Sequence, residues 1–235
     1  MKTISIIIPT FNEEETIKEI LLAINNNKHD SYNFEVIVVD DGSSDKTQNI
    51  LSSVPHLYSK LILQKNNQGK GAAVKKGMLN ASGDYILFQD ADLEYDPGDY
   101  SKLLSMISKF DADLVIGSRL IAPEYTRVYY FWHKVGNKII TLIFNLLNNT
   151  TFTDIYSCYL LFKRNLLDLN QVKSIGWEQQ AEILSLLVVS TKKMFEVPIK
   201  YNGRTYGEGK KIRAHHAFFV IWMIIKKFFI IKLKR

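Results

Sequence analysis

Acidic side chains follow one short apolar stretch at a regular spacing. The stretch 84–89 is entered through Ala-Ser-Gly and predicts a buried strand. Asp90 and Asp92 come directly after it, and alternate residues of an extended chain point the same way. Glu94 continues the row if the chain stays extended. Carboxylates gathered in this way repel each other and favour a hard cation, Mg²⁺ or Mn²⁺, whose shell substrate phosphates complete.

Two other interpretations of this acidic stretch were considered. A solvated acidic turn without a ligand has the same spacing and stays open as an alternative. A calcium-binding loop needs Gly at its sixth position and Glu at its twelfth, where this chain has Tyr95 and Ser101. The calcium loop is therefore excluded, and a metal–diphosphate site is the simplest interpretation.

Two more polar loops follow predicted buried strands. The strands expected over 3–9 and 34–39 lead into the loops 9–13 and 40–45. Strands that alternate with helices form a mostly parallel sheet, and ligands bind beyond the carboxyl ends of such strands. We therefore expect these two loops and the loop 90–94 to converge on one edge of the sheet. Three converging loops are stronger evidence for a site than any one of them.

The alternation of strand and helix patterns predicts one α/β domain. A chain of 235 residues that is 46% hydrophobic is long enough to bury a sizeable core. The helices show apolar residues at helical spacing, and the strands are short apolar runs. Helices are expected over 14–26, 100–110 and 177–189. Two more are expected, one that starts near 47 and one that follows the loop 66–71 and ends at 81. Further strands are expected over 57–64, 112–117, 156–162 and 195–201.

The loop Gly69-Lys70-Gly71 resembles a phosphate-binding motif only superficially. It lacks the P-loop spacing, and Val74 stands where a dinucleotide fingerprint has Gly or Ala. A helix N-terminus with Gly and Lys still suits an anion, which makes Lys70 a candidate for donor binding. A tight turn without a ligand explains the loop equally well.

Charge is distributed unevenly along the chain. The segment 200–235 holds ten of the 30 basic residues and one of the 24 acidic residues, so it carries +9 and the rest −3. A nucleic-acid surface over the whole protein is therefore not expected. The single cysteine, Cys158, excludes a disulfide framework and suits a reducing compartment. Strand-like sequence begins directly after Lys2, so we expect no signal peptide.

Two apolar segments are candidates for a membrane surface. The helix expected over 132–147 is either a core helix or a helix lying on lipid. In 214–235, Lys226-Lys227 separates the apolar runs 217–225 and 228–231. Neither run approaches the roughly 20 residues of a spanning helix, and mixed lysines and aromatics fit an amphipathic helix on anionic lipid. A C-terminal helix packed on the domain is the alternative.

Four motifs together resemble those of family 2 glycosyltransferases, which have the GT-A fold. They are Ile7-Ile8-Pro9-Thr10-Phe11-Asn12-Glu13, Val38-Val39-Asp40-Asp41-Gly42-Ser43, Asp90-Ala91-Asp92-Leu93 and Ile116-Gly117-Ser118-Arg119. The stretch 197–211 resembles the branch of dolichol-phosphate mannosyltransferases and bacterial polyprenyl-phosphate glycosyltransferases. The resemblance covers nearly the whole chain. It implies a Rossmann-like, mostly parallel sheet flanked by helices over 1–213, and the amphipathic helix forms a separate unit over 214–235.

The resemblance also implies roles for particular residues. The donor nucleoside would be held by Pro9, Phe11, Glu13, Val39 and Asp41. Mg²⁺ or Mn²⁺ would be held by Asp90, Asp92 and Glu94. The phosphates would be met by Arg119, Arg204 and Lys210, which together with Asp92 are the expected catalytic residues. His133 stands where mannosyltransferases often have Arg, and it is a candidate for the acceptor region.

Two acids at the start of the expected helix 177–189 are candidates for a general base. Glu178 and Glu182 lie four residues apart and share a helix face. A sugar hydroxyl needs such a base, whereas a phosphate monoester is mostly dianionic at pH 7 and needs cations instead. Acidic side chains also stabilise a helix N-terminus through the helix dipole, and this effect alone explains both positions. The basic candidates outnumber the acids, which favours a phosphate acceptor.

The sequence therefore predicts an inverting, metal-dependent glycosyltransferase. Its donor would be a nucleotide-diphosphate sugar, GDP-mannose or a UDP-hexose, and its acceptor a polyprenyl or dolichyl phosphate. We expect it on the cytoplasmic, inner face of the cell membrane, bound peripherally to the anionic surface. One alternative is transfer to a hydroxyl of a cell-surface glycan, and another is a non-catalytic membrane-surface protein of the same fold. The full row of carboxylates argues against the non-catalytic protein.

Overall fold

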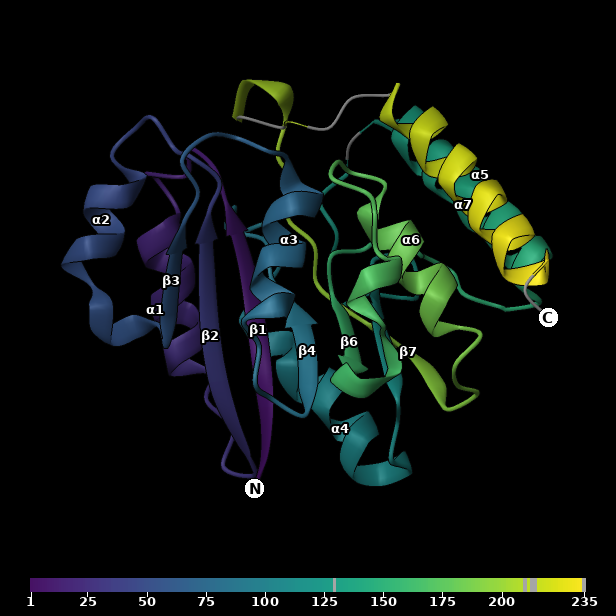
Figure 1. Ribbon diagram of the computed structural model, residues 1–235, viewed down its shortest axis with the longest axis horizontal. Coiled ribbons are helices and arrows are strands. Elements are labelled where there is room, and N and C mark those ends of the chain that lie inside the picture. Colours follow the sequence, from purple (N-terminus) through teal and green to yellow (C-terminus); the bar gives the residue numbers. More distant parts are fainter. Residues whose placement is uncertain (129, 209–210, 212–214, 234–235) are drawn as a thin grey trace.

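A seven-stranded sheet in the order β3-β2-β1-β4-β6-β5-β7 organises the chain (Figure 1). The computed structural model describes residues 1–128, 130–208, 211 and 215–233. The strands are β1 (Lys2–Thr10), β2 (Tyr32–Asp40), β3 (Lys60–Leu63), β4 (Tyr85–Phe88), β5 (Leu114–Ser118), β6 (Leu160–Lys163) and β7 (Met194–Pro198). The helices are α1 (Ile17–Asn26), α2 (Thr47–Ser53), α3 (Lys70–Leu79), α4 (Tyr100–Phe110), α5 (Phe131–Asn148), α6 (Gln179–Leu187) and α7 (His216–Leu233). Short 3₁₀ turns lie at Pro55–Leu57, Pro97–Asp99, Arg164–Leu166, Leu169–Gln171 and Tyr206–Glu208.

The sheet is mostly parallel, as the alternating pattern predicted. β3, β2, β1 and β4 run parallel to one another, and β5 runs parallel to β7. Only β6 is antiparallel to both of its neighbours. The expected α/β class and the flanking helices are confirmed, and the strand expected over 156–162 is shorter than predicted.

The register of the central strands brings the polar loops to one edge. Ile4, Ile6, Ile7 and Ile8 of β1 are fully buried, which explains why this strand reads as an unbroken apolar run. Pro9 pairs with Val39 and Thr10 with Asp40, so β1 and β2 end at the same level. β4 runs parallel beside β1, so the loops after all three strands leave the sheet on the same side.

The helix α7 packs beside α5 and against α6 (Figure 1). It buries Val220, Ile224 and Lys227, so the alternative of a helix packed on the domain holds for one of its faces. Its other face remains apolar and solvent-exposed. No described helix is both long enough and apolar enough to cross a membrane. The division of the chain between 213 and 214 falls among residues outside the described ones and stays a prediction.

A buried carboxylate on β2 ties the strand to the turn that precedes β4. Glu35 accepts hydrogen bonds from Ser5 Oγ at 2.5 Å and from the Ser82 amide at 2.8 Å. Its other oxygen accepts from Lys60 Nζ and Ser82 Oγ, each at 2.8 Å. Burial by itself would raise the pKa of Glu35, but these hydrogen bonds outweigh it and lower the pKa to about 2. Glu35 therefore stays ionised in the folded protein at any pH where its unfolded counterpart is ionised.

We expect Glu35→Gln to lower the free energy of unfolding by about 1–3 kcal/mol at pH 7, because buried donors lose a charged acceptor. The depressed pKa means that this stabilisation is present above about pH 4.5 and is lost as the pH falls towards 2. Urea denaturation across that range measures it. The exposed Glu19→Gln on α1 is the control. Equal stabilities of Glu35→Gln and the control at pH 7 would contradict the assignment.

Candidate active site

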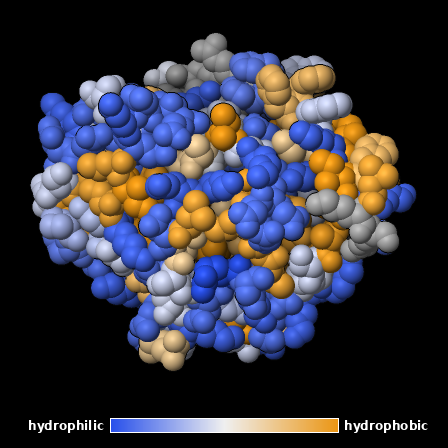
Figure 2. Space-filling view, in the orientation of Figure 1, coloured by the Kyte–Doolittle hydropathy of each residue, from blue (hydrophilic) through white to orange (hydrophobic). Residues whose placement is uncertain are grey.

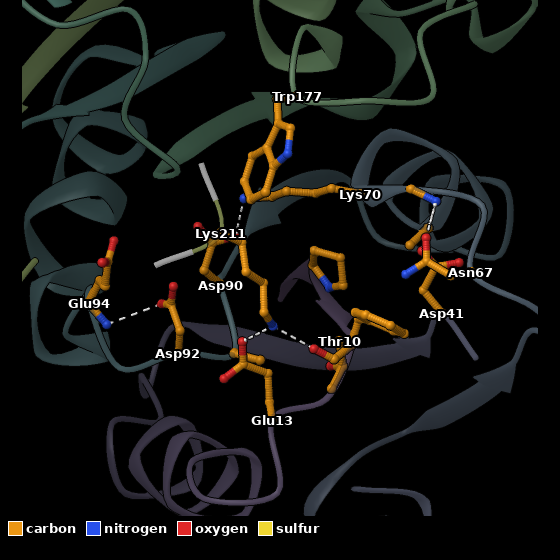
Figure 3. Close-up of a pocket in the computed structure, with 15 residues that line it drawn as sticks. Thr10, Glu13, Asp41, Asn67, Lys70, Asp90, Asp92, Glu94, Trp177 and Lys211 are labelled. Atoms are coloured by element: carbon orange, nitrogen blue, oxygen red, sulfur yellow. Dashed lines mark hydrogen bonds and ion pairs between the residues drawn. The ribbon is translucent and has the colours of Figure 1, made fainter. Parts of the chain in front are cut away.

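A cavity of about 360 Å³ opens at the carboxyl ends of β1, β2 and β4 (Figure 3). A cavity of this size is within the range of small-molecule sites. Its lining comes from all three expected loops, from the segment 67–73 and from two later parts of the chain. The lining residues are Pro9, Thr10, Phe11, Glu13, Asp41, Asn67, Gly69, Lys70, Ala73, Asp90, Ala91, Asp92, Glu94, Trp177 and Lys211. The predicted convergence of the loops 9–13, 40–45 and 90–94 is therefore confirmed.

Lys70 reaches from the first turn of α3 into the cavity, where Figure 3 shows it between Asp90 and Trp177. Its ammonium lies 2.5 Å from Asp90 Oδ1 and 5.1 Å from the centre of the Trp177 ring. Burial would lower the pKa of Lys70, but the Asp90 carboxylate outweighs it and raises the pKa above its usual range. The lysine is therefore a fixed cation in the cavity.

The two glycines beside Lys70 have a structural explanation. Gly69 has φ +98°, and a Cβ there would lie 2.5 Å from the carbonyl oxygen of Ile175. That carbonyl accepts hydrogen bonds from the amides of Gly71, at 2.8 Å, and Ala72, at 3.2 Å. The amide of Gly69 donates to Asp41 Oδ2. Because these amides at the start of α3 already have partners, the expected anion site at this N-terminus is reduced to the Lys70 side chain.

The carboxylate of Asp41 accepts hydrogen bonds from the loop before α3. Oδ1 accepts from Gln64 Nε2 at 2.6 Å and from the Gln68 amide at 2.9 Å. Burial raises the pKa of Asp41, against the effect of these hydrogen bonds. The residue thus shapes the wall of the cavity from Gln64 to Gly69, in addition to facing the cavity itself.

Glu13 gathers two cations from the end of the chain. Its Oε2 accepts from both terminal nitrogens of Arg204 at 3.1 Å, and its Oε1 lies 2.6 Å from Lys211 Nζ. Lys211, which Figure 3 shows beside Glu13, also donates to the carbonyl of Phe11. Two cations therefore stand at one carboxylate on the rim of the cavity, although Arg204 itself is not among the lining residues.

The buried side-chain amide of Gln89 fixes the turn after β4. Gln89 Oε1 accepts from the hydroxyls of Tyr100 and Tyr159, at 2.7 and 2.8 Å. Its Nε2 donates to the carbonyl of Asp90 at 2.9 Å. All three aromatic and amide side chains are buried, so the position of Asp90 is set by the core.

The predicted row of three carboxylates is divided in the structure. The chain turns after Asp90 instead of remaining extended, and Leu93 has φ +60°. Glu94 accepts from the Tyr201 hydroxyl at 2.9 Å and from the Arg204 amide at 2.6 Å. Across the described residues, no three His, Cys, Asp or Glu side chains are grouped to hold a metal ion. The turn thus directs Glu94 towards the loop that follows β7.

The charges at Asp92 nevertheless suit a cation. Burial and the neighbouring carboxylates of Asp90 and Glu94 raise the pKa of Asp92 to about 7. Arg204 and Lys70 lower this pKa, but their effect is smaller. A hard cation stabilises a buried carboxylate beside other carboxylates more than it stabilises a carboxylate that already has an ion-pair partner. Asp92, with Asp90 beside it, is therefore the part of the site whose chemistry fits Mg²⁺ or Mn²⁺.

Several predicted residues lie away from the cavity. Val39 is fully buried in the sheet, His133 lies in the first turn of α5, and Glu182 is fully buried beneath α7. Glu178 accepts from the Gly176 amide at the start of α6 and does not line the cavity. Lys210 lies outside the described residues. The roles expected of these residues stay predictions.

Arg119 has a different environment from the one expected for a phosphate ligand. Its Nε lies 2.7 Å from Asp154 Oδ2, its Nη2 lies 2.9 Å from Oδ1, and Asp154 is fully buried. Its guanidinium lies 5.0 Å from the centre of the Tyr201 ring. A bidentate buried pair of this kind holds both partners in one geometry. Arg119 thus fixes the segment around Asp154 and is not among the lining residues.

Sequence reasoning missed Trp177, Lys211, Thr10 and Asn67 as lining residues. Trp177 and Lys211 are more than 80 positions from the loop 90–94, so nothing in their local patterns indicates the cavity. Lys211 neighbours the predicted Lys210, and the Gly-rich basic loop was the available signal. Thr10 and Asn67 belong to loops that had been identified.

Comparison with known proteins agrees with this architecture. The family model "Glycosyl transferase family 2" matches residues 5–169, which include the loops of β1, β2 and β4 and the end of β5. The chain belongs to this family. The resemblance drawn from the four motifs is thereby confirmed.

Relatives with similar sequences carry names of sugar transfer. The chain is 30% identical to a dolichol-phosphate mannosyltransferase of Pyrococcus furiosus over 88% of its length and 58% of the relative's. It is 29% identical to a low-salt glycan biosynthesis hexosyltransferase of Haloferax volcanii over 86% of its length and 48% of the relative's. It is 28% identical to a UDP-N-acetylglucosamine–dolichyl-phosphate N-acetylglucosaminyltransferase of Methanococcus voltae, over 96% of each chain. The chain thus spans about half the length of the first two family members and nearly all of the third.

Solved structures support the fold. The glucosyl-3-phosphoglycerate synthase of Mycobacterium tuberculosis, in complex with Mn²⁺, UDP and glucosyl-3-phosphoglycerate, superposes with a TM-score of 0.71. The match covers 96% of this chain and 80% of that one at 19% identity. At this identity the likeness concerns the GT-A fold.

We expect Asp92→Asn to weaken Mn²⁺-dependent binding of UDP and GDP by about tenfold or more, because the loss of a single supporting group at a metal site costs that much. The metal-free variant should be at least as stable as the wild type at pH 8, since the substitution removes repulsion from Asp90 and Glu94. Calorimetric titration and thermal unfolding measure the two effects. The exposed Asp30→Asn is the control. Unchanged Mn²⁺-dependent affinity would exclude Asp92 as a ligand.

Proposed function

We propose that this protein is an inverting, metal-dependent glycosyltransferase that moves a sugar from a nucleotide-diphosphate donor to a polyprenyl phosphate. One observation carries the proposal: acids suited to a divalent cation and cations suited to phosphates meet in a single cavity of this family's fold. The names of two relatives, which refer to dolichol phosphate or dolichyl phosphate, support the acceptor class. The donor would be GDP-mannose or a UDP-hexose.

The donor would occupy the cavity with its base towards Pro9, Phe11 and Asp41. Its diphosphate would then lie towards Lys70 and Lys211, whose ammonium groups face the cavity. Both lysines hold carboxylates in this state, Lys70 with Asp90 and Lys211 with Glu13. An incoming diphosphate offers these cations a stronger acceptor than a carboxylate that is already shared.

Asp92 and Asp90 are the residues that would hold Mg²⁺ or Mn²⁺. When bound, such an ion neutralises the charge of the departing nucleoside diphosphate. The M. tuberculosis synthase that shares the fold was solved with Mn²⁺ and UDP, and with Mg²⁺ and UDP. The remaining contribution of this chain is to orient the donor and to supply fixed charges near the breaking bond.

The acceptor would be a phosphate. A hydroxyl acceptor needs a free general base, and neither of the predicted acids is well suited to that role. Glu182 is fully buried and paired with Lys227, and Glu178 is hydrogen-bonded to the Gly176 amide. A phosphate dianion attacks the anomeric carbon without losing a proton, and the bond from that carbon to the nucleoside diphosphate breaks. Arg204, at the rim beside Glu13, is the cation best located to receive it.

A lipid acceptor would be met at the membrane, and the pair α5–α7 offers a surface for it. Figure 2 shows hydrophobic side chains gathered at the right of the molecule, over these two helices. The exposed ones are Phe131, Trp132, Ile139, Leu142, Leu146, Phe218, Phe219, Trp222, Phe229, Ile230 and Leu233. Neither helix contains an acid, and both carry lysines. We therefore propose that the α5–α7 face rests on anionic lipid at the cytoplasmic side of the cell membrane, with 214–235 as the membrane-surface helix.

Transfer assays separate a phosphate acceptor from a hydroxyl acceptor. We expect Arg204→Ala to reduce kcat/KM by about a hundredfold or more, because a charge-assisted contact to an anion is worth a few kcal/mol. Glu178→Gln should cost less than about tenfold, since no base is required. The assay uses GDP-mannose and UDP-hexoses with a short-chain prenyl phosphate, and a free glycan as competing acceptor. The opposite order of effects would favour the hydroxyl acceptor.

Vesicle binding tests the α5–α7 face. We expect the double variant Phe218→Ser/Trp222→Ser to bind phosphatidylserine-containing vesicles at least about tenfold more weakly, because both exposed aromatic side chains lose their burial in lipid. Salt should weaken wild-type binding, since each lysine near the surface contributes about 1 kcal/mol that ions screen. The control is Leu79→Ser, which alters an exposed leucine on α3. Full-length protein that ignores these vesicles at low salt would disprove this part.

A further inference from the structure

Two neighbouring lysines of α7 have opposite environments. Lys226 is exposed, whereas Lys227 is 6% exposed. The ammonium of Lys227 lies 2.7 Å from Oε1 of Glu182 on α6, a side chain with no exposure at all. An ion pair removed from water in this way is costly to break, because either partner alone would be a buried charge. The pair therefore makes a strong and specific joint between α6 and α7.

The same two side chains also hold the segment 171–177, which we call the connecting segment. Glu182 Oε2 accepts from the amides of Lys173, at 2.9 Å, and Ser174, at 2.7 Å. Lys227 Nζ donates to the carbonyl of Gln171 at 2.8 Å. One end of the connecting segment is thus fixed through the ion pair and not through its own side chains.

The other edge of the connecting segment forms part of the cavity wall. Ile175 accepts the hydrogen bonds from Gly71 and Ala72 that open α3, and Val172 accepts from Lys75 Nζ at 2.6 Å. Trp177 ends the segment and lies over Lys70, the cation that holds Asp90. Hydrogen bonds joined by short stretches of backbone, and finally the contact of Trp177 with Lys70, therefore connect α7 to the charged groups of the cavity.

We propose that the Glu182–Lys227 ion pair is a positioning element that couples the seating of α7 to the placement of Lys70 and Trp177 in the cavity. The proposal rests on the function proposed above, since it gives the membrane-facing helix an effect on donor binding. Whatever stabilises α7 in its seat also stabilises the connecting segment, and by linkage a donor that requires an ordered cavity wall strengthens the seating of α7. Contact with lipid would be one such stabilising influence, because it covers the exposed apolar face of α7.

Amide hydrogen exchange in the lipid-free, full-length protein tests the joint. In Lys227→Met, the amides of Gly71 and Ala72 should exchange about tenfold faster, because their acceptor Ile175 is no longer held. The matched control is Lys226→Met, which changes the same residue type one position earlier and should leave these amides within twofold of wild type. The amides of α4 report global stability and should stay unchanged in Lys226→Met. In Lys227→Met the unpaired, buried Glu182 lowers global stability, so the faster exchange at 71 and 72 is measured relative to any change in α4. Unaltered exchange at 71 and 72 in a folded Lys227→Met would overturn the proposal.

A second variant covers the case in which Lys227→Met does not fold. The double variant Glu182→Gln/Lys227→Met removes both buried charges together, and such replacements are often tolerated. Its Gln retains an oxygen that can accept from Lys173 and Ser174. The joint to α7 is lost, so faster exchange at Gly71 and Ala72 is again expected, with α4 unchanged. Equal exchange in the double variant and the wild type would count against the proposal.

Reciprocal binding tests the functional consequence. The affinity for phosphatidylserine–phosphatidylcholine vesicles is measured without nucleotide and with Mn²⁺ plus UDP or GDP. Wild type and Lys226→Met should bind vesicles about fivefold more tightly with nucleotide, the lower end of ordinary coupling, and the double variant should show no such gain. Nucleotide and vesicle binding that are independent in the wild type would overturn the coupling. A wild type that binds no nucleotide would overturn the proposed function instead, and the exchange experiment would still judge the joint.

Discussion

The repulsion among acidic side chains at the carboxyl edge of the sheet is the constraint on which the site depends. Acids lie at or just after the ends of three parallel strands there, and burial makes each ionised acid costly unless a donor or cation stands beside it. Asp90 has Lys70, Glu13 has Arg204 and Lys211, and Asp41 has backbone amides. Asp92 alone among these has its pKa raised to about 7, by burial and by like charges. Among the described residues, the arrangement thus leaves Asp92 without an ion-pair partner in a cavity whose other acids accept from cations, amides or a hydroxyl.

Two of the cations at this edge come from distant parts of the chain. Arg204 and Lys211 follow β7, which lies at the far end of the sheet from β2. The loop that carries them is held in turn by Glu94, through Tyr201 and the Arg204 amide. The acids of the N-terminal half and the cations of the C-terminal half therefore complete each other. A fragment that ends after β5 would contain the family's motifs and an unbalanced site.

The helices α5 and α7 extend this dependence beyond the cavity. Each is apolar enough to be buried, yet each keeps a solvent-exposed apolar face while packing on the other. Such a face has a physical explanation in a lipid surface, and the absence of acids from both helices is consistent with anionic lipid. The Glu182–Lys227 ion pair and the connecting segment link α7 to the wall of the cavity. Membrane contact and donor binding would then be parts of one device.

The succession of strands and helices along the chain, the α/β class and the convergence of three polar loops followed from the sequence, because apolar runs and turn signals are local and parallel strands share an edge. The order of the strands within the sheet came only from the structure. The acids Asp90 and Asp92 could be identified in the same way. Their detailed roles could not, because the turn at Leu93 and the pairing of Arg119 with Asp154 depend on contacts between residues far apart in the chain. Lys226 and Lys227 illustrate the difference best. In the sequence they are two equal interruptions of an apolar run, and only the packing of α7 on α6 leaves one in solvent and buries the other against Glu182.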